Sequence, residues 1–152
     1  MKVAFVCLGN ICRSPMAEAV FQHIINEKGL GDSVHVESFG TANYHVGDKP
    51  DYRTIATCKR HGIPINHRGQ QIKPKHFKEF DFILCMDESN LYNLKRIQPN
   101  DSKAKVMLFG EYSTDGKYDK IVDDPYYGGE DGFEACYNQC VHFTENFIKQ
   151  EL

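Results

Sequence analysis

The sequence predicts a single α/β domain that spans residues 1–152. Apolar runs of strand length alternate with segments of helical period, which is the pattern of α/β proteins. The run Phe82–Met86 is continuously apolar, as expected of a parallel strand that is covered on both faces. No internal repeat or low-complexity linker divides the chain, and a chain of this length buries about two thirds of its unfolded surface in one core.

Four segments are expected to form strands because they are short and rich in apolar residues. They are Val3–Val6, Val34–Phe39, Phe80–Met86 and Lys105–Phe109. The first helix is expected to have Ser14 as its N-terminal cap and Pro15 at its first helical position, and to stop at Gly29. Further helices are expected at Tyr52–His61, Ser89–Ile97 and Phe133–Lys149.

Composition limits the classes of partner. The 18 basic and 21 acidic residues leave a formal charge of -3, which argues against nucleic acid as the main partner. No segment approaches the roughly 20 apolar residues of a membrane helix, and neither end resembles a targeting segment. The six cysteines are scattered and lack the spacing of a zinc site. We therefore expect a cytoplasmic protein, mainly monomeric, with reduced thiols and no metal.

The segment Val6–Pro15 combines a strand that ends in a cysteine, a turn of small and polar residues, and an arginine at the start of a helix. Backbone amides in such a turn can bind an anion, and phosphate is the obvious one. Five residues separate Cys7 from Arg13, so a loop that wraps around a tetrahedral anion places the guanidinium beside the sulfur. A cysteine in this setting is expected to be a thiolate at neutral pH.

This loop resembles the signature of the low-molecular-weight protein tyrosine phosphatase (acid phosphatase) family, Cys-x5-Arg followed by Ser. The segment Asp123–Gly128 resembles the family's acid loop, and Phe82–Leu91 and Tyr137–Val141 also match, so the resemblance covers nearly the whole chain. It implies a four-stranded parallel sheet with helices on both faces, a Rossmann-like three-layer sandwich. The implied activity is hydrolysis of phosphotyrosine in proteins and of small aryl phosphates through a phosphocysteine, with no cofactor and with inhibition by phosphate-like oxyanions.

The resemblance also assigns the chemical roles. Cys7 attacks phosphorus, Arg13 and the loop amides hold the phosphoryl oxygens, and Asp124 is the general acid. The choice of Asp124 over Asp123 rests on the resemblance. The phosphate-binding residues are Leu8, Gly9, Asn10, Ile11, Cys12 and Arg13.

Several neighbours are expected to support the loop. Ser14 either caps the helix or, as in the family, donates toward the thiolate. Asn10 tolerates a positive φ and matches the family position that bonds the counterparts of Ser14, Ser38 and His67. The family also implies a reversible disulfide between Cys7 and Cys12, which would protect the nucleophile from irreversible oxidation.

Aromatic side chains are expected to wall the substrate cleft. The residues that match the family's cleft walls are Leu8, Tyr44, Tyr126 and Tyr127. Aromatic walls can stack on a phenyl ring, which favours phosphotyrosine over phosphoserine. Several family members carry tryptophan where this chain has Tyr44, and the pair Gly69–Gln70 replaces a more usual small residue and arginine.

Three alternative functions remain open from the sequence. An arsenate reductase on the same fold needs a relay of further cysteines, and Cys85 lies in an expected strand without a near partner, while Cys136 and Cys140 lie on an expected helix. A non-catalytic phosphotyrosine-binding module would have no need of Cys7 and Asp124. A flavodoxin-like electron carrier shares only the fold class.

Overall fold

The computed structural model describes residues 1–114, 116–127 and 129–152; the side chains of Tyr127 and Glu130 also lie outside the described part. Four parallel strands form one sheet in the order β2-β1-β3-β4. The strands are β1 (Lys2–Cys7), β2 (His35–Gly40), β3 (Phe82–Cys85) and β4 (Lys105–Leu108). The predicted α/β class and the four-stranded parallel sheet are confirmed.

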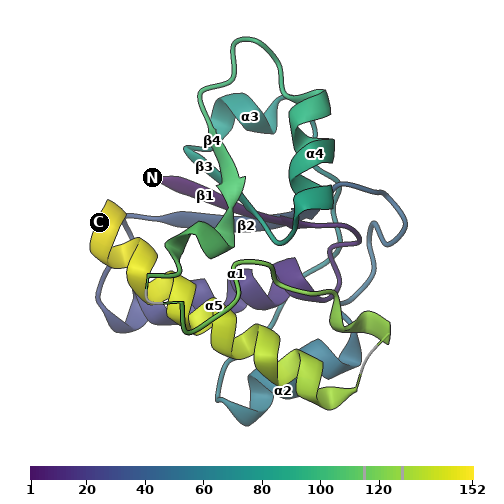
Figure 1. The fold of residues 1–152 in the computed structure, drawn as a ribbon, viewed down its shortest axis with the longest axis vertical. Coiled ribbons are helices and arrows are strands. Elements are labelled where there is room, and N and C mark those ends of the chain that lie inside the picture. The colour runs from purple at the N-terminus through teal and green to yellow at the C-terminus, as the bar shows by residue number, and fades with distance from the viewer. Residues whose placement is uncertain (115, 128) are drawn as a thin grey trace.

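Helices cover both faces of the sheet (Figure 1). The helices are α1 (Arg13–Glu27), α2 (Tyr52–Arg60), α3 (His76–Glu79), α4 (Glu88–Ile97) and α5 (Glu130–Glu151). Figure 1 shows α1, α2 and α5 below the sheet and α3 and α4 above it. Two short 3-10 turns, Phe109–Tyr112 and Pro125–Tyr127, precede α5. This is the three-layer arrangement implied by the family resemblance.

Two cores result from the alternation of side chains along the central strand. Val3 and Phe5 of β1 belong to the larger core with α1 and α5, whereas Ala4 and Val6 point to the smaller core under α3 and α4. All four side chains are fully buried. Aromatic rings fill the larger core, where Phe5 contacts its neighbour Phe109 edge to face at 4.8 Å between ring centroids.

Some sequence-predicted boundaries are wrong. The strand expected at Phe80–Met86 is limited to Phe82–Cys85, since Phe80 is the C-terminal cap of α3, a one-turn helix that the sequence pattern did not indicate. The helix expected to be capped by Ser14 begins at Arg13, and no side chain caps it. Its first residues are buried, so the Ser14 hydroxyl points into the molecule rather than toward the free backbone amides.

The sheet topology places the loops that carry chemistry at one edge. In a parallel sheet all carboxyl ends lie on the same side, and ligands bind where the strand order reverses. Here the chain leaves β1 toward β2 on one side, whereas β3 lies on the other side. Cys7 ends β1 and Asp87 follows β3 at this edge. Within the described residues, no helix is both long and apolar enough to cross a membrane.

Candidate active site

The loop between β1 and α1 wraps around the sulfur of Cys7. This side chain is only 3% exposed and lies at the end of the fully buried strand β1. The amide of Asn10 donates to its Sγ at 3.3 Å, and the hydroxyl of Ser14 lies 3.0 Å from it. Both contacts stabilise a negative charge on sulfur when the hydroxyl donates.

Asn10 holds the loop in its shape. It is the one non-glycine residue with a positive φ (59°) in the described part of the chain, and its side chain is buried. Its Nδ2 donates to the hydroxyls of Ser14 (2.8 Å) and Ser38 (3.0 Å). Its Oδ1 accepts from Nε2 of His67 (2.9 Å) and from the amide of Gln70 (2.8 Å). Every hydrogen-bonding position of the amide group is therefore used, which offsets the strain of the left-handed backbone.

Glu18 completes this network, and sequence reasoning missed it. The hydroxyl of Ser38 donates to its Oε1 at 2.5 Å, and Nδ1 of His67 lies 3.2 Å from the same oxygen. A signal was present, because Glu18 follows Ser14 by one helical turn and therefore shares its face of α1. The two side chains that position Asn10 are themselves held by one carboxylate.

The pair Gly69–Gln70, where this chain departs from the family pattern, lies beside Asn10 and takes part in the same network of hydrogen bonds. A Cβ on Gly69 would overlap the carbonyl oxygen of His45, so the backbone approach there requires glycine. The Gln70 side chain donates to the carbonyl of Ser38 at 3.1 Å and to Glu37 at 3.3 Å. The pair thus fastens the 67–71 segment to β2, next to Asn10.

Arg13 is buried and held by two acceptors. Its Nη1 donates to Oδ2 of Asp87 at 2.6 Å and to the carbonyl of Val122 at 3.0 Å, and its Nη2 lies 3.7 Å from Oδ2 of Asp124. Burial by itself would lower the pKa of Arg13, but Cys7, Asp87 and Asp124 raise it above its ordinary value. The guanidinium is thus a permanent positive charge beside the sulfur.

Asp87 is the second important residue that sequence reasoning did not assign. It caps α4 by accepting the amide of Asn90 at 2.8 Å on Oδ1, and Oδ2 remains for Arg13. Asn90 in turn accepts the amides of Met86 and Asp87, each at 3.2 Å. A carboxylate that directly follows a buried parallel strand was the available signal, because such residues gather at the carboxyl edge of the sheet.

The acid-loop segment is joined to this edge through its backbone. The amide of Val122 donates to the carbonyl of Met86 at 2.9 Å, while its own carbonyl accepts from Arg13. Asp124 lies two residues further along the chain, and its Oδ1 accepts the amide of Tyr126 at 3.0 Å. The Asp124 side chain is 39% exposed, so it is open to solvent while it faces Arg13.

Arg53 ties the acid-loop segment to the loop around Cys7, and it too was missed. Its Nη2 donates to the carbonyl of Tyr126 at 2.9 Å and to Asp51 at 3.0 Å, and its guanidinium lies 4.7 Å from the ring centroid of Phe133. The amide of Asp51 donates to the carbonyl of Ile11 at 2.8 Å. Burial would raise the pKa of Asp51, but its hydrogen bonds to Arg53 lower it.

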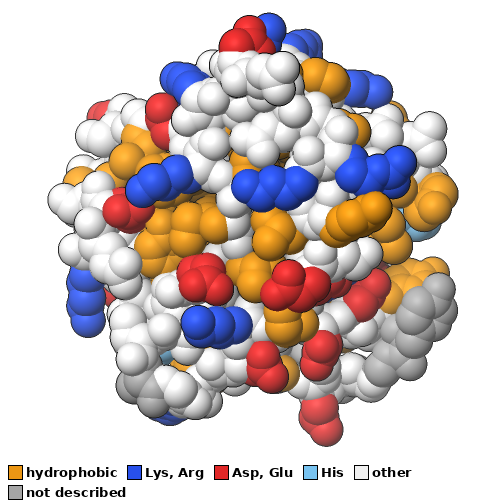
Figure 2. Space-filling view, turned by 45° about the horizontal axis from the view of Figure 1, so that its top comes forward, with side chains coloured by type: hydrophobic (Ala, Val, Ile, Leu, Met, Phe, Trp, Pro, Cys, Tyr) orange, Lys and Arg blue, Asp and Glu red, His pale blue; other side chains and the backbone are white. Residues whose placement is uncertain are grey.

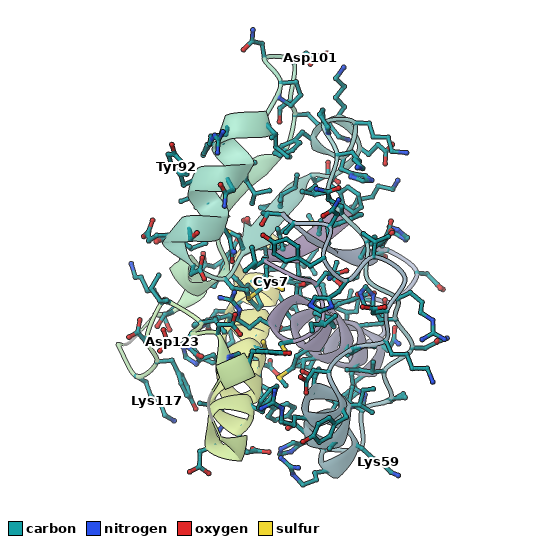
Figure 3. All side chains as sticks on the ribbon, turned by 90° about the vertical axis from the view of Figure 1, so that its right-hand side faces the viewer. Cys7, Lys59, Tyr92, Asp101, Lys117 and Asp123 are labelled. Carbon is teal, nitrogen blue, oxygen red and sulfur yellow. The ribbon has the colours of Figure 1, made fainter. Side chains whose placement is uncertain are left out.

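One cavity of about 210 Å³ joins these parts, and Figure 3 places Cys7 between α4, which carries Tyr92, and the loop that carries Asp123. It is lined by Cys7, Leu8, Gly9, Ile11, Cys12, Arg13, Tyr44, His45, Asp124 and Tyr126. Most predicted site residues therefore meet here. Asn10, Ser14, Ser38 and His67 lie behind the loop, and the side chain of Tyr127 lies outside the described residues. Asp123 does not line this cavity, whereas Asp124 does.

Cys12 shares the cavity with Cys7, and both are free thiols in the structure. Burial raises the pKa of Cys12 well above its ordinary value, and Asp51, Cys7 and Asp124 add to this effect. Cys12 is thus held in its protonated form next to Cys7. The disulfide between the two stays a prediction.

Comparison with known proteins settles the family. A sequence model described as "Low molecular weight phosphotyrosine protein phosphatase" matches residues 2–152. The chain belongs to this family. A curated relative of that name from Saccharomyces cerevisiae is 54% identical over 154 residues, covering 100% of this chain and 96% of the relative.

Solved structures agree with this membership. A protein tyrosine phosphatase from Entamoeba histolytica with Hepes in its active site has a TM-score of 0.94 and 38% identity, covering 99% of this chain and 96% of that one. A drosophila arginine phosphatase has a TM-score of 0.91 and 38% identity, covering 98% and 96%. Phosphatases with differently named substrates therefore share this fold.

Proposed function

We propose that this member of the low molecular weight phosphotyrosine protein phosphatases hydrolyses phosphotyrosine in proteins, and small aryl phosphates, through a phosphocysteine on Cys7. The observation that carries the proposal is the buried Cys7 sulfur with the Asn10 amide and the Ser14 hydroxyl at 3.3 and 3.0 Å. These donors favour the thiolate, and the fixed Arg13 guanidinium supplies the positive charge that a phosphoryl group needs.

In the first step the Cys7 thiolate attacks phosphorus in line with the departing phenolate oxygen. The S–P bond forms as the P–O bond breaks, and the proton of the Asp124 carboxyl moves to the leaving oxygen. Arg13 and the amides of residues 8–13 hold the three equatorial oxygens, where charge accumulates. Asp124 suits this role because it lines the cavity and is partly exposed on the Arg13 side.

In the second step water attacks the phosphocysteine. Asp124, now a carboxylate, accepts a proton from the water as its oxygen bonds to phosphorus, and the S–P bond breaks. The sulfur leaves as a thiolate, to which Ser14 donates. Asn10, Ser38 and His67 act as positioning residues behind the loop, because their contacts fix Asn10 and Ser14 rather than reach the cavity.

The cavity walls favour an aryl phosphate. Leu8, Ile11, Tyr44 and Tyr126 present apolar and aromatic surface above Cys7. Such walls pack on a phenyl ring, whereas the shorter phosphoserine side chain leaves them in water. Phosphoarginine is the competing substrate, because one solved relative is an arginine phosphatase. A cationic guanidinium gains less from apolar walls than a phenyl ring does.

The remaining cysteines argue against arsenate reduction by a thiol relay. Such a relay needs accessible thiols that ionise easily. Cys85 is fully buried in β3, where burial first and then Asp87 raise its pKa to about 12. Cys58, Cys136 and Cys140 are buried as well.

A reduced Cys7 nucleophile also suits a reducing compartment, so we place the activity of this one-domain protein in the cytoplasm as a monomer.

The test compares peptides that carry phosphotyrosine, phosphoserine or phosphoarginine, together with para-nitrophenyl phosphate. We expect turnover of the phosphotyrosine peptide and the aryl phosphate, inhibition by vanadate, and loss of turnover in Cys7→Ser. Cys58→Ala, which removes a buried thiol of α2, is the matched control and should keep turnover. Turnover that survives Cys7→Ser would contradict the mechanism, and a preference for phosphoarginine would contradict the substrate assignment.

A further inference from the structure

A second groove opens from the active-site cavity toward the carboxyl end of α4. It is lined by Leu8, Thr41, Ala42, Tyr44, Asn93, Arg96 and Ile97. Leu8 and Tyr44 also line the cavity above Cys7. The two depressions therefore share a wall, and a chain bound with its phosphotyrosine over Cys7 can continue into this groove.

The large apolar and aromatic side chains that line the groove are exposed to solvent. Tyr44 is 71% exposed, Leu8 41% and Ile97 40%. These side chains come from three different segments: the loop after β1, the loop after β2, and the end of α4. Exposed apolar groups that gather beside a ligand cavity are typical of a surface that becomes covered on binding.

Arg96 gives the groove its charge. In the described part of the structure no carboxylate lies within 4.0 Å of its guanidinium, and its recorded contact is the ring of Tyr92 at 5.8 Å. No acidic residue lines the groove. The Asp124 carboxylate, which is partly exposed, lies in the part of the cavity that the groove does not share. Figure 2 shows a row of basic side chains along the upper side of an exposed hydrophobic band and several acidic side chains along its lower side, with charges of both signs elsewhere on this face.

We propose that this groove binds the peptide that flanks the phosphotyrosine, and that Arg96 selects an acidic side chain there. The inference rests on the proposed function, since the peptide is placed by its phosphotyrosine. An extended peptide advances about 3.3 Å per residue and alternates its side chains, so a residue one to three positions away from the phosphotyrosine reaches a neighbouring groove. Leu8 and Ile97 pack on its aliphatic part, and Arg96 pairs with its carboxylate.

The experiment uses a set of phosphotyrosine peptides in which one glutamate is moved from three positions before to three positions after the phosphotyrosine in an alanine background. The measured quantity is kcat/KM of each glutamate peptide relative to the all-alanine peptide. We expect about a two- to fivefold preference for glutamate at one position on one side, the factor of an exposed ion pair, and a smaller one at high salt.

Variants then assign the preference to Arg96. In Arg96→Gln the ratio should fall to about one, and in Arg96→Glu a lysine peptide should be preferred at the same position. The ratio cancels any general change in turnover. Lys95→Gln is the matched control, because this exposed neighbour on α4 does not line the groove, and it should keep the wild-type ratio.

The outcomes separate this inference from the function on which it rests. If the wild type cleaves para-nitrophenyl phosphate and the alanine peptide but prefers glutamate at no position, the groove assignment is wrong while the phosphatase assignment stands. A preference that survives Arg96→Gln, or that disappears equally in Lys95→Gln, also overturns it. Failure to cleave either substrate would instead reject the proposed function.

Discussion

The substitution Asp87→Asn should show how much Asp87 contributes by positioning Arg13, as distinct from capping α4. The asparagine keeps an oxygen that can accept the amide of Asn90, but it removes the charge that faces Arg13 Nη1 at 2.6 Å. Arg13 is only 3% exposed, so little water can replace the lost partner. It retains the carbonyl of Val122 and the neighbouring Asp124.

The magnitude follows from the geometry. A hydrogen bond to a charged group contributes about 1.5–3 kcal/mol. If this hydrogen bond keeps the Arg13 guanidinium oriented in the transition state, losing its energy corresponds to a loss of about 10- to 150-fold in kcat/KM. The free energy of unfolding should fall by a similar amount, because a buried guanidinium loses its main partner.

The assay combines para-nitrophenyl phosphate kinetics with urea unfolding of the same preparations. Asn90→Ala is the matched control, because it removes the side-chain oxygen that accepts the amides of Met86 and Asp87 at the start of α4 and leaves the contact between Asp87 and Arg13 in place. We expect it to lower stability by about 1–2 kcal/mol while kcat/KM changes little. If Asp87→Asn and Asn90→Ala lose stability alike and both keep kcat/KM within about twofold, the claim that Asp87 positions Arg13 is refuted.

Four further outcomes are expected. Asn10→Gly, which keeps the left-handed backbone but removes the side-chain hydrogen bonds, should lower kcat about tenfold or more. An unchanged kcat would show that these hydrogen bonds do not position the loop for catalysis. Asp124→Asn should lose more turnover of an aryl phosphate than Asp123→Asn, and the reverse order would move the general acid to Asp123. After peroxide inactivation, dithiothreitol should restore the wild type better than Cys12→Ser, and equal recovery would count against the disulfide. Because Arg53 lowers the pKa of Asp51 in the folded state, Asp51 should stabilise the fold above about pH 3.9 and lose that contribution as pH falls further; the stability gap between wild type and Asp51→Asn, measured by urea unfolding, should narrow on acidification.

The fold was largely predictable because local signals agreed with the tertiary structure. The continuous apolar run at Phe82–Met86 and the stripe that follows Pro15 have the periods of a buried strand and of a helix. What failed depended on distant contacts. Ser14 has the residue type of a cap, but its hydroxyl contacts Cys7 and Asn10, and the helix begins two residues before the expected Pro15.

The site residues divide in the same way into those that local sequence predicts and those that depend on distant contacts. Cys7 and Arg13 are close in sequence, so one loop conformation brings them together, and spacing alone suggested it. Glu18, Asp87 and Arg53 act across long sequence separations. The local signals at Glu18 and Asp87 give a position on a helix face or at a strand end, but they do not identify the distant partner. Only the sheet topology, which gathers the carboxyl ends of β1 and β3, makes Asp87 a partner of Arg13.

The two supports of the loop act on different parts of the reaction. Asn10, held through Ser38, His67 and Glu18, fixes the backbone amides around the sulfur and does not depend on the acid loop. Arg13 is held by Asp87 and by the carbonyl of Val122, two residues before Asp124. A change in the acid loop therefore reaches the guanidinium through the Val122 carbonyl and through Asp124, whereas the contacts of the Cys7 sulfur with the Asn10 amide and the Ser14 hydroxyl do not involve that loop. For this reason substitutions behind Asn10 should affect both chemical steps, while those near Val122 should alter the protonation of the leaving group together with the orientation of Arg13.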